Sequence, residues 1–89
     1  MQLHAVIYGR VQGVGFRYFT RETAKKLGVK GWVKNNPDGT VEVLAEADEN
    51  TLKQFLEKLY QGPPLSKVEN IKYQFSEASG GFKDFEIRY

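Results

Sequence analysis

The segment Asn36-Pro37-Asp38-Gly39 most constrains the fold, because it has the composition of a tight turn and lies between two strand-like runs. These runs are Val29 to Asn35 and Thr40 to Ala47. Side chains in such runs alternate between two faces, and Val33 and Asn35 share one of them. Two strands joined by so short a connection pair antiparallel. The sequence therefore predicts a β-hairpin here and argues against a parallel βαβ unit.

The segments around the hairpin predict two helices. An apolar strand, Leu3 to Tyr8, precedes a helix that begins near Phe16 and is closed by Gly28. Asp48 is expected to cap a second helix, which Gly62-Pro63-Pro64 ends. The apolar stripe of this second helix is predicted to be Leu52, Phe55, Leu56, Leu59 and Tyr60.

Two further strands complete the order. Val68 to Phe75 predicts a strand, and the odd spacing from Val68 to Ile71 predicts either a bulge or a later start of this strand. Phe85, Ile87 and Tyr89 alternate in a short final strand. The order is strand, helix, strand, strand, helix, strand, which is typical of the split βαβ pattern. We therefore expect an α+β fold, a ferredoxin-like α/β sandwich (βαββαβ) with an antiparallel sheet and two helices on one face. Residues 1–89 are expected to form one domain.

The N-terminal segment has the features of an anion-binding loop. The first 21 residues contain no Asp or Glu, and Tyr8 to Arg17 is glycine-rich between a strand and a helix. Glycines allow backbone N–H groups to converge, and a helix N-terminus adds unpaired donors and partial positive charge. Arg17 would lie in the first turn, where the helix dipole disfavours a cation unless an anion is present. The segment predicts an oxyanion site, with phosphate as the expected ligand.

Charge and composition limit the partners. The net charge is only +2, while Arg10, Arg17 and Arg21 all precede the first acid, Glu22. This placement favours a small anion over a polyanion. The sequence has no cysteine, no long apolar segment and no signal-peptide pattern. We expect a cytoplasmic monomer that binds neither nucleic acid nor membrane.

The better-known phosphate loops do not fit. A Walker A loop ends in Gly-Lys-Ser/Thr, whereas Gly15 is followed by Phe16 and Arg17. The dinucleotide fingerprint requires a third glycine where this chain has Tyr18. Gly13 to Phe19 echoes an RNA-binding signature, but that signature belongs on a central strand. The predicted third strand, Thr40 to Ala47, has no aromatic residue.

The remaining chemistry is electrostatic. There is no cysteine nucleophile, the serines lie far from the loop, His4 has no evident neighbour to orient it, and the acids form no metal-ligand cluster. Phosphoryl transfer depends mainly on positioning and charge stabilisation, which Arg17 and loop amides could supply while Asn35 holds the attacking water. Without a strong acid for the leaving group, such a site suits acyl phosphates. Taken singly, the glycines, Arg17 and Asn35 could also be ordinary turn and surface residues.

The chain closely resembles the acylphosphatases over essentially its whole length. The matching segments are Gly9-Arg10-Val11-Gln12-Gly13-Val14-Gly15-Phe16-Arg17, Gly28-Val29-Lys30-Gly31-Trp32-Val33-Lys34-Asn35, Asp38-Gly39-Thr40-Val41-Glu42, Gly62-Pro63-Pro64 and Phe85-Glu86-Ile87-Arg88-Tyr89. The resemblance implies a ferredoxin-like fold and hydrolysis of the carboxyl-phosphate bond of acyl phosphates such as 1,3-bisphosphoglycerate and carbamoyl phosphate.

By this resemblance Arg17 is the phosphate-binding arginine and Asn35 orients the water. The backbone donors of the loop would be Gln12, Gly13, Val14, Gly15 and Phe16. The family implies no metal and no organic cofactor. The alternative is a noncatalytic module of the same fold. Such a module would bind RNA or resemble the acylphosphatase-type domain of carbamoyl-phosphate-using maturation proteins.

Overall fold

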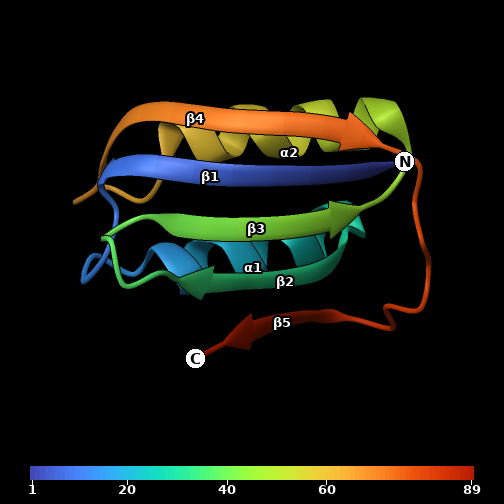
Figure 1. The fold of residues 1–89 in the computed structure, drawn as a ribbon, viewed down its shortest axis with the longest axis horizontal. Coiled ribbons are helices and arrows are strands. Elements are labelled where there is room, and N and C mark those ends of the chain that lie inside the picture. The colour runs from blue at the N-terminus through green and yellow to red at the C-terminus, as the bar shows by residue number, and fades with distance from the viewer.

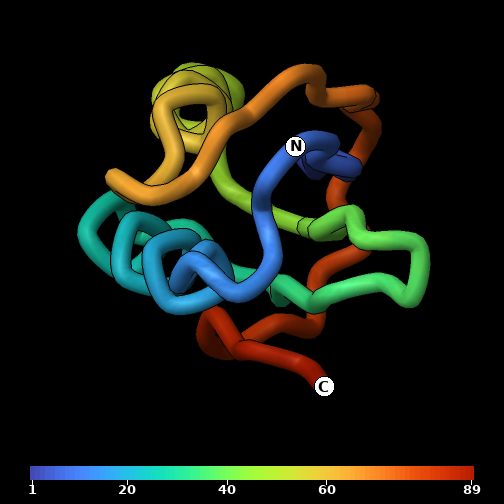
Figure 2. The backbone as a smooth tube through the Cα atoms, turned by 90° about the vertical axis from the view of Figure 1, so that its left-hand side faces the viewer, coloured from blue at the N-terminus to red at the C-terminus, as the bar shows by residue number.

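The computed structural model describes residues 1–89 as a five-stranded sheet with two helices on one face (Figures 1 and 2). In chain order the elements are β1 (Gln2–Arg10), α1 (Phe16–Leu27), β2 (Lys30–Asn35), β3 (Val41–Glu46), α2 (Glu49–Gln61), β4 (Lys67–Ser76) and β5 (Phe85–Arg88). The predicted α+β sandwich is confirmed. No helix is long and apolar enough to cross a membrane.

The sheet has the strand order β4-β1-β3-β2-β5. The predicted hairpin is present as the antiparallel pair β2–β3, in which Asn35 is opposite Val41. β1 pairs antiparallel with both β3 and β4. β5 differs from the expectation of a purely antiparallel sheet, because it adds to the edge of β2 in parallel. The final strand thus lies beside the strand that ends at Asn35.

The alternating pattern of the strands determines which face holds the core. Along β1 and β3, every second residue is buried beneath the helices, from Leu3 to Ile7 and from Val41 to Ala45. These side chains belong to a core cluster of 17 buried residues that includes Phe55 of α2. At Gly31 of β2 the φ angle is +142°, and a Cβ atom would lie 1.9 Å from the carbonyl oxygen of Leu44. This close approach of β2 to β3 therefore requires glycine.

Two local expectations had different outcomes. The bulge is confirmed, because the β1–β4 register shifts between Tyr8, which pairs with Asn70, and Gly9, which pairs with Val68. Tyr60 was wrongly assigned to the apolar stripe of α2, since it is 46% exposed while its neighbour Leu59 is fully buried. The stripe that packs against the sheet is narrower than the sequence pattern predicted.

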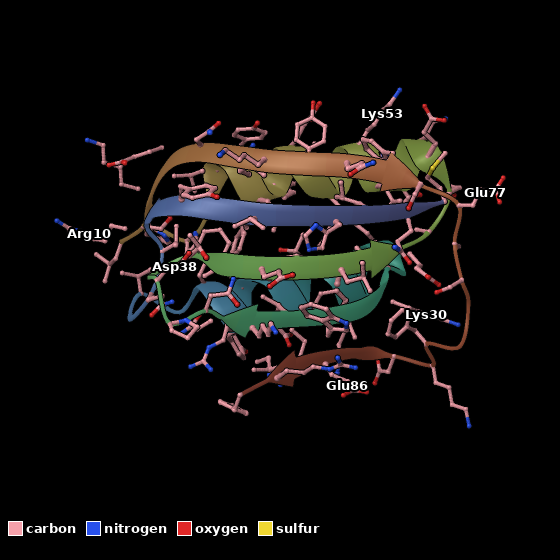
Figure 3. All side chains as sticks on the ribbon, in the orientation of Figure 1. Arg10, Lys30, Asp38, Lys53, Glu77 and Glu86 are labelled. Atoms are coloured by element: carbon pink, nitrogen blue, oxygen red, sulfur yellow. The ribbon has the colours of Figure 1, made fainter.

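Several chain reversals meet at one end of the sheet. β1 and β2 end there, β3 begins there, and the C-terminus of the chain lies there as well (Figure 1). Figure 3 shows Arg10 and Asp38 at this end, whereas Lys30 and Glu77 lie at the other. The glycine-rich loop of residues 11–15 is therefore close to the turn that follows Asn35.

Candidate active site

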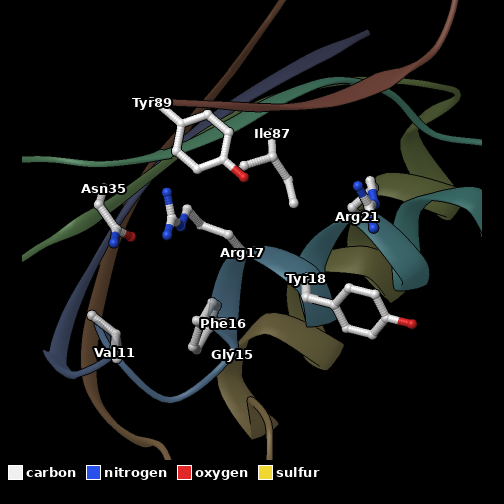
Figure 4. A pocket seen from close by; sticks show the side chains of 10 residues that line it. Val11, Gly15, Phe16, Arg17, Tyr18, Arg21, Asn35, Ile87 and Tyr89 are labelled. Atoms are coloured by element: carbon white, nitrogen blue, oxygen red, sulfur yellow. The ribbon is translucent and has the colours of Figure 1, made fainter.

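A cavity of about 310 Å³ lies at this end of the molecule, and Figure 4 shows it from close by. Its walls come from the loop after β1, the first turns of α1, the end of β2 and the C-terminal segment. We call it the site cavity. The residues that line it are Val11, Gly13, Gly15, Phe16, Arg17, Tyr18, Arg21, Asn35, Ile87 and Tyr89.

The loop at the floor of the site cavity depends on left-handed glycines. Gly13 has φ +74° and Gly15 has φ +79°, a region that L side chains rarely adopt. Apart from each glycine and its two chain neighbours, no protein atom lies within 4 Å of the position where a Cβ atom would be built. None of the N–H groups of residues 12–15 donates to another backbone group. The loop is therefore open to a ligand on this side and retains free donors.

The start of α1 adds positive potential to the cavity. Its N-cap residue, Gly15, supplies no side-chain hydrogen bond, and the first turn contains no acid. The first N–H groups of a helix have no intrahelical acceptor and carry the positive end of the helix dipole. Arg17 lies in this turn and forms no ion pair. Its guanidinium carbon lies 4.8 Å from the centre of the Tyr89 ring, so an aromatic ring holds the side chain without neutralising it.

Asn35 contributes an unpaired acceptor to the same cavity. It is the last residue of β2 and shares the helix-side face with Val33. Its Oδ1 atom is buried and has no hydrogen-bond partner within the protein. A buried acceptor without a partner costs about 1–3 kcal/mol, so this atom is an exception that requires an explanation. In Figure 4 the side chains of Asn35 and Arg17 point toward one another.

The side chain of Gln12 joins the loop to the turn after Asn35. Its Nε2 group donates to the carbonyl oxygens of Asn36, at 2.8 Å, and Thr40, at 2.9 Å. The turn itself is closed by Asp38, whose carboxylate accepts from the hydroxyl and the N–H of Thr40. These bonds lower the pKa of Asp38, first through the Thr40 hydroxyl and then through its N–H. The two parts of the site are thus held in a fixed relation.

Comparison with known proteins identifies the family. The model of the Acylphosphatase family matches residues 3–87. The chain belongs to the acylphosphatase family. An acylphosphatase from Bacillus licheniformis is 47% identical over 89 residues, which is 100% of this chain and 99% of that protein. The crystal structure of acylphosphatase from Bacillus subtilis has a TM-score of 0.96 and 48% identity, and the match covers 99% of this chain and 98% of that one. This acylphosphatase-family chain is accordingly a hydrolase.

A larger protein also contains this fold. Full-length HypF, solved in a phosphate- and nucleotide-bound form, matches with a TM-score of 0.87 and 34% identity. The match covers 99% of this chain but only 12% of HypF. The likeness to HypF therefore concerns one part of a much longer protein, whereas the likeness to the two Bacillus acylphosphatases spans nearly their whole length.

The structure brings together only part of the predicted set. Gly13, Gly15, Phe16, Arg17 and Asn35 all line the site cavity. Two other loop residues do not line it. Gln12 extends to the neighbouring turn, and Val14 packs against the core.

Sequence reasoning missed five residues that line the cavity: Val11, Tyr18, Arg21, Ile87 and Tyr89. A signal existed for Arg21, because it follows Arg17 at the helical spacing of four. No local signal existed for Ile87 and Tyr89. Their position depends on the parallel pairing of β5 with β2.

The other titratable groups lie elsewhere. His4 does have a partner, contrary to the sequence-based expectation. Its Nε2 atom lies 2.7 Å from Oε2 of Glu42 on the uncovered face of the sheet, and this hydrogen bond is the main cause that lowers the pKa of Glu42. Neither residue lines the site cavity. No group of three or more His, Asp or Glu side chains could hold a metal ion.

Proposed function

We propose that this protein hydrolyses acyl phosphates to a carboxylate and inorganic phosphate at the site cavity. Arg17 and the N–H groups of the loop bind the phosphoryl oxygens, and Asn35 positions the attacking water. The observation that carries the proposal is the buried, unpaired Oδ1 of Asn35 in the same cavity as the unpaired guanidinium of Arg17. One group needs a hydrogen-bond donor, and the other needs an anion.

The two groups suit the two reactants of this hydrolysis. Water donates a hydrogen bond to Asn35 Oδ1, so its oxygen lone pair is free to attack phosphorus. As the new P–O bond forms, the bond from phosphorus to the acyl oxygen breaks, and the carboxylate leaves without needing a proton. The proton of the attacking water remains with the phosphate product or passes to solvent. Arg17 and the loop donors stabilise the charge on the three equatorial oxygens.

The proposed reaction uses no general acid or base, because the fixed positions of the phosphoryl group and the water lower the barrier instead. The loop is held to the turn after Asn35 by Gln12, so the phosphoryl site and the water site have a fixed separation. Fixed orientation of two reactants can supply several kcal/mol of the barrier lowering. An alkyl phosphate, whose leaving alkoxide needs protonation, should be a poor substrate at such a site. Selectivity for acyl phosphates follows from the chemistry of the leaving group.

A second candidate function rests on the likeness to HypF. A noncatalytic or accessory domain of this fold could bind phosphate-containing ligands without turning them over. The coverage favours the stand-alone enzyme, since the curated acylphosphatase relatives are matched over nearly their full length. The two candidates differ in one measurable property, which is turnover by the isolated chain.

The test compares turnover with phosphate binding in one variant. The purified protein is expected to hydrolyse benzoyl phosphate in the presence of excess chelator. Asn35→Ala should reduce kcat roughly 100-fold, because the water loses its acceptor, while the Kd for inorganic phosphate changes by no more than about threefold. Asn50→Ala is the matched control, since Asn50 is exposed at the start of α2.

Two results would contradict the proposal. Absence of turnover in the unaltered protein would favour the noncatalytic module, and loss of turnover on adding chelator would exclude the metal-free mechanism. If Asn35→Ala retained full kcat while phosphate still bound, Asn35 would not position the water.

A further inference from the structure

Arg21 is the second cation of the site cavity, and it has no part in the proposed reaction. It follows Arg17 by four residues in α1, so both side chains project from the same face of the helix, and both line the cavity. Like charges at this spacing repel and destabilise a helix. The pair becomes favourable when anions occupy the cavity. One phosphoryl group at Arg17 accounts for only one of the two cations.

The charge of Arg21 is poorly compensated within the protein. Its Nε atom lies 3.4 Å from Oε2 of Glu22, longer than a good charge-assisted hydrogen bond, and the two side chains are 32% and 42% exposed. Such a pair contributes little. The Arg21 guanidinium carbon also lies 5.3 Å from the centre of the Tyr18 ring. Tyr18 therefore supports Arg21 at the rim of the cavity, where the guanidinium can still bind an anion.

The direction of the reaction determines which part of a substrate meets Arg21. In phosphoryl transfer the attacking and leaving oxygens are roughly in line, so the leaving group lies opposite the water. With the water at Asn35 and the phosphoryl group at Arg17, the acyl group leaves on the side away from Asn35. Figure 4 shows Arg21 and Tyr18 on that side, with Ile87 above the space between the two arginines.

We infer that Arg21 makes this enzyme select acyl phosphates whose acyl group carries a second anionic group, a carboxylate or a phosphate. The inference rests on the proposed function, because the in-line reaction at Asn35 and Arg17 places the acyl group. A guanidinium can bind either anion through two parallel N–H donors. The apolar atoms between the two anionic groups of the substrate would contact Ile87 and Tyr18.

The proposed contact has a kinetic signature. The charge of the distal group does not change as the P–O bond breaks, so Arg21 stabilises the bound substrate and the transition state equally. Loss of such uniform binding raises KM and leaves kcat nearly constant. A general disturbance of α1 would instead lower kcat, because Arg17 and the loop donors belong to the same helix start.

The test uses two substrates that differ at one position, benzoyl phosphate and 4-carboxybenzoyl phosphate. The measured quantity is the ratio of their kcat/KM values, anionic over neutral. In Arg21→Gln we expect this ratio to fall roughly tenfold through KM, the size of one lost charge-assisted contact at a partly exposed site. Lys25→Gln removes the same charge one turn further along α1, at an exposed position outside the cavity. It should change the ratio by less than about twofold, as distant charges are screened by salt.

The outcomes separate this inference from the proposed function. If Arg21→Gln keeps the ratio of the unaltered protein, or if Lys25→Gln lowers it equally, the Arg21 inference is overturned while the hydrolysis stands. A ratio that falls through kcat alone also overturns it. If neither substrate is hydrolysed, the proposed function fails. In that case calorimetry measures the Kd values of benzylphosphonate and 4-carboxybenzylphosphonate for the unaltered protein and for Arg21→Gln. If the ratio of the two Kd values is the same in both proteins, the Arg21 contact is excluded.

Discussion

The two helices of this protein begin in opposite ways. α2 starts with Asp48, whose Oδ1 accepts from the N–H of Thr51 at 2.8 Å, and Glu49 places an acid in the first turn. α1 starts with a glycine in the left-handed region, has no side-chain cap and has no acid in its first turn. Its first turn holds the guanidinium of Arg17, whereas the first turn of α2 holds the carboxylate of Glu49. Side chains of α2 satisfy its own N-terminus, whereas no side chain caps the N-terminus of α1.

We propose that the start of α2 serves stability and the start of α1 serves binding. A good N-cap side chain contributes roughly 0.5–2 kcal/mol to the free energy of unfolding. α1 lacks this contribution. Glu49 also pairs with Lys53 at 3.0 Å, so the first turn of α2 has both favourable charge and a side-chain pair. Substitutions at the two starts should therefore have opposite consequences. At α1 they should change activity more than stability, and at α2 the reverse.

The largest expected effect is that of Arg17→Gln. Removing the guanidinium should lower kcat/KM for an acyl phosphate roughly 100- to 1000-fold, because the charge of the transition state loses a preorganised partner. The free energy of unfolding in urea should change by less than about 1 kcal/mol, since Arg17 forms no ion pair, opposes the helix dipole and contacts only the exposed ring of Tyr89. Arg10→Gln, at an exposed position outside the cavity, is the control. Unchanged kinetics in Arg17→Gln would exclude Arg17 from the site.

Gln12→Ala should affect both properties. It removes two hydrogen bonds to the carbonyl oxygens of Asn36 and Thr40, so we expect a loss of about 1–2 kcal/mol in the free energy of unfolding. The loop would also move relative to Asn35, which should lower kcat/KM roughly tenfold. Gln54→Ala, on the exposed side of α2, should change neither quantity. If the activity of Gln12→Ala stayed normal, the loop would keep its position without the two hydrogen bonds of Gln12.

Asp48→Ala should have the reverse profile of Arg17→Gln. Loss of the cap leaves the N–H of Thr51 unpaired, so the melting temperature should fall by a few degrees. Activity should be unchanged, as Asp48 lies outside the site cavity. Asp48→Asn retains an acceptor and should restore most of the stability. A loss of activity in Asp48→Ala would show that the two helix starts are coupled.

The smallest effect is the pH dependence of that cap. The N–H of Thr51 is the main cause that lowers the pKa of Asp48 below its usual 3.8 in the folded protein. The lowered pKa means that the cap contributes fully above about pH 3.8 and is lost as the pH falls through the folded value. The difference in melting temperature between the unaltered protein and Asp48→Ala should therefore shrink below that pH. A difference that stayed constant with pH would contradict the role of the carboxylate.

The features that sequence reasoning predicted are those with local causes. The turn before Thr40 and the glycine-rich connection between β1 and α1 depend on residues that are neighbours in the chain. Burial of alternate residues in β1 and β3 follows from the period of the strands. The same period placed Asn35 on one face with Val33, and in the structure this is the face that Val33 buries in the core.

The features that were missed depend on long-range partners. Nothing near Gln12 in the sequence indicates that its side chain binds two carbonyl oxygens of a distant turn. His4 and Glu42 meet only because β1 and β3 pair in one particular register. Ile87 and Tyr89 reach the cavity because β5 adds in parallel beside β2. Helical periodicity gives the direction of the apolar stripe of α2 but does not determine its width. Tyr60 was misassigned to the stripe for this reason.

One wall of the site cavity is formed by the short strand β5, which is the edge strand of the sheet. It has four residues, pairs with β2 alone and contributes Ile87 to the site. Edge segments with few hydrogen bonds open locally at a lower free energy than the core. Amide hydrogens of residues 85–88 should therefore exchange with solvent faster than those of β1. A ligand that contacts Ile87 should slow this exchange, so that the occupancy of the site can be followed from the backbone of the last strand.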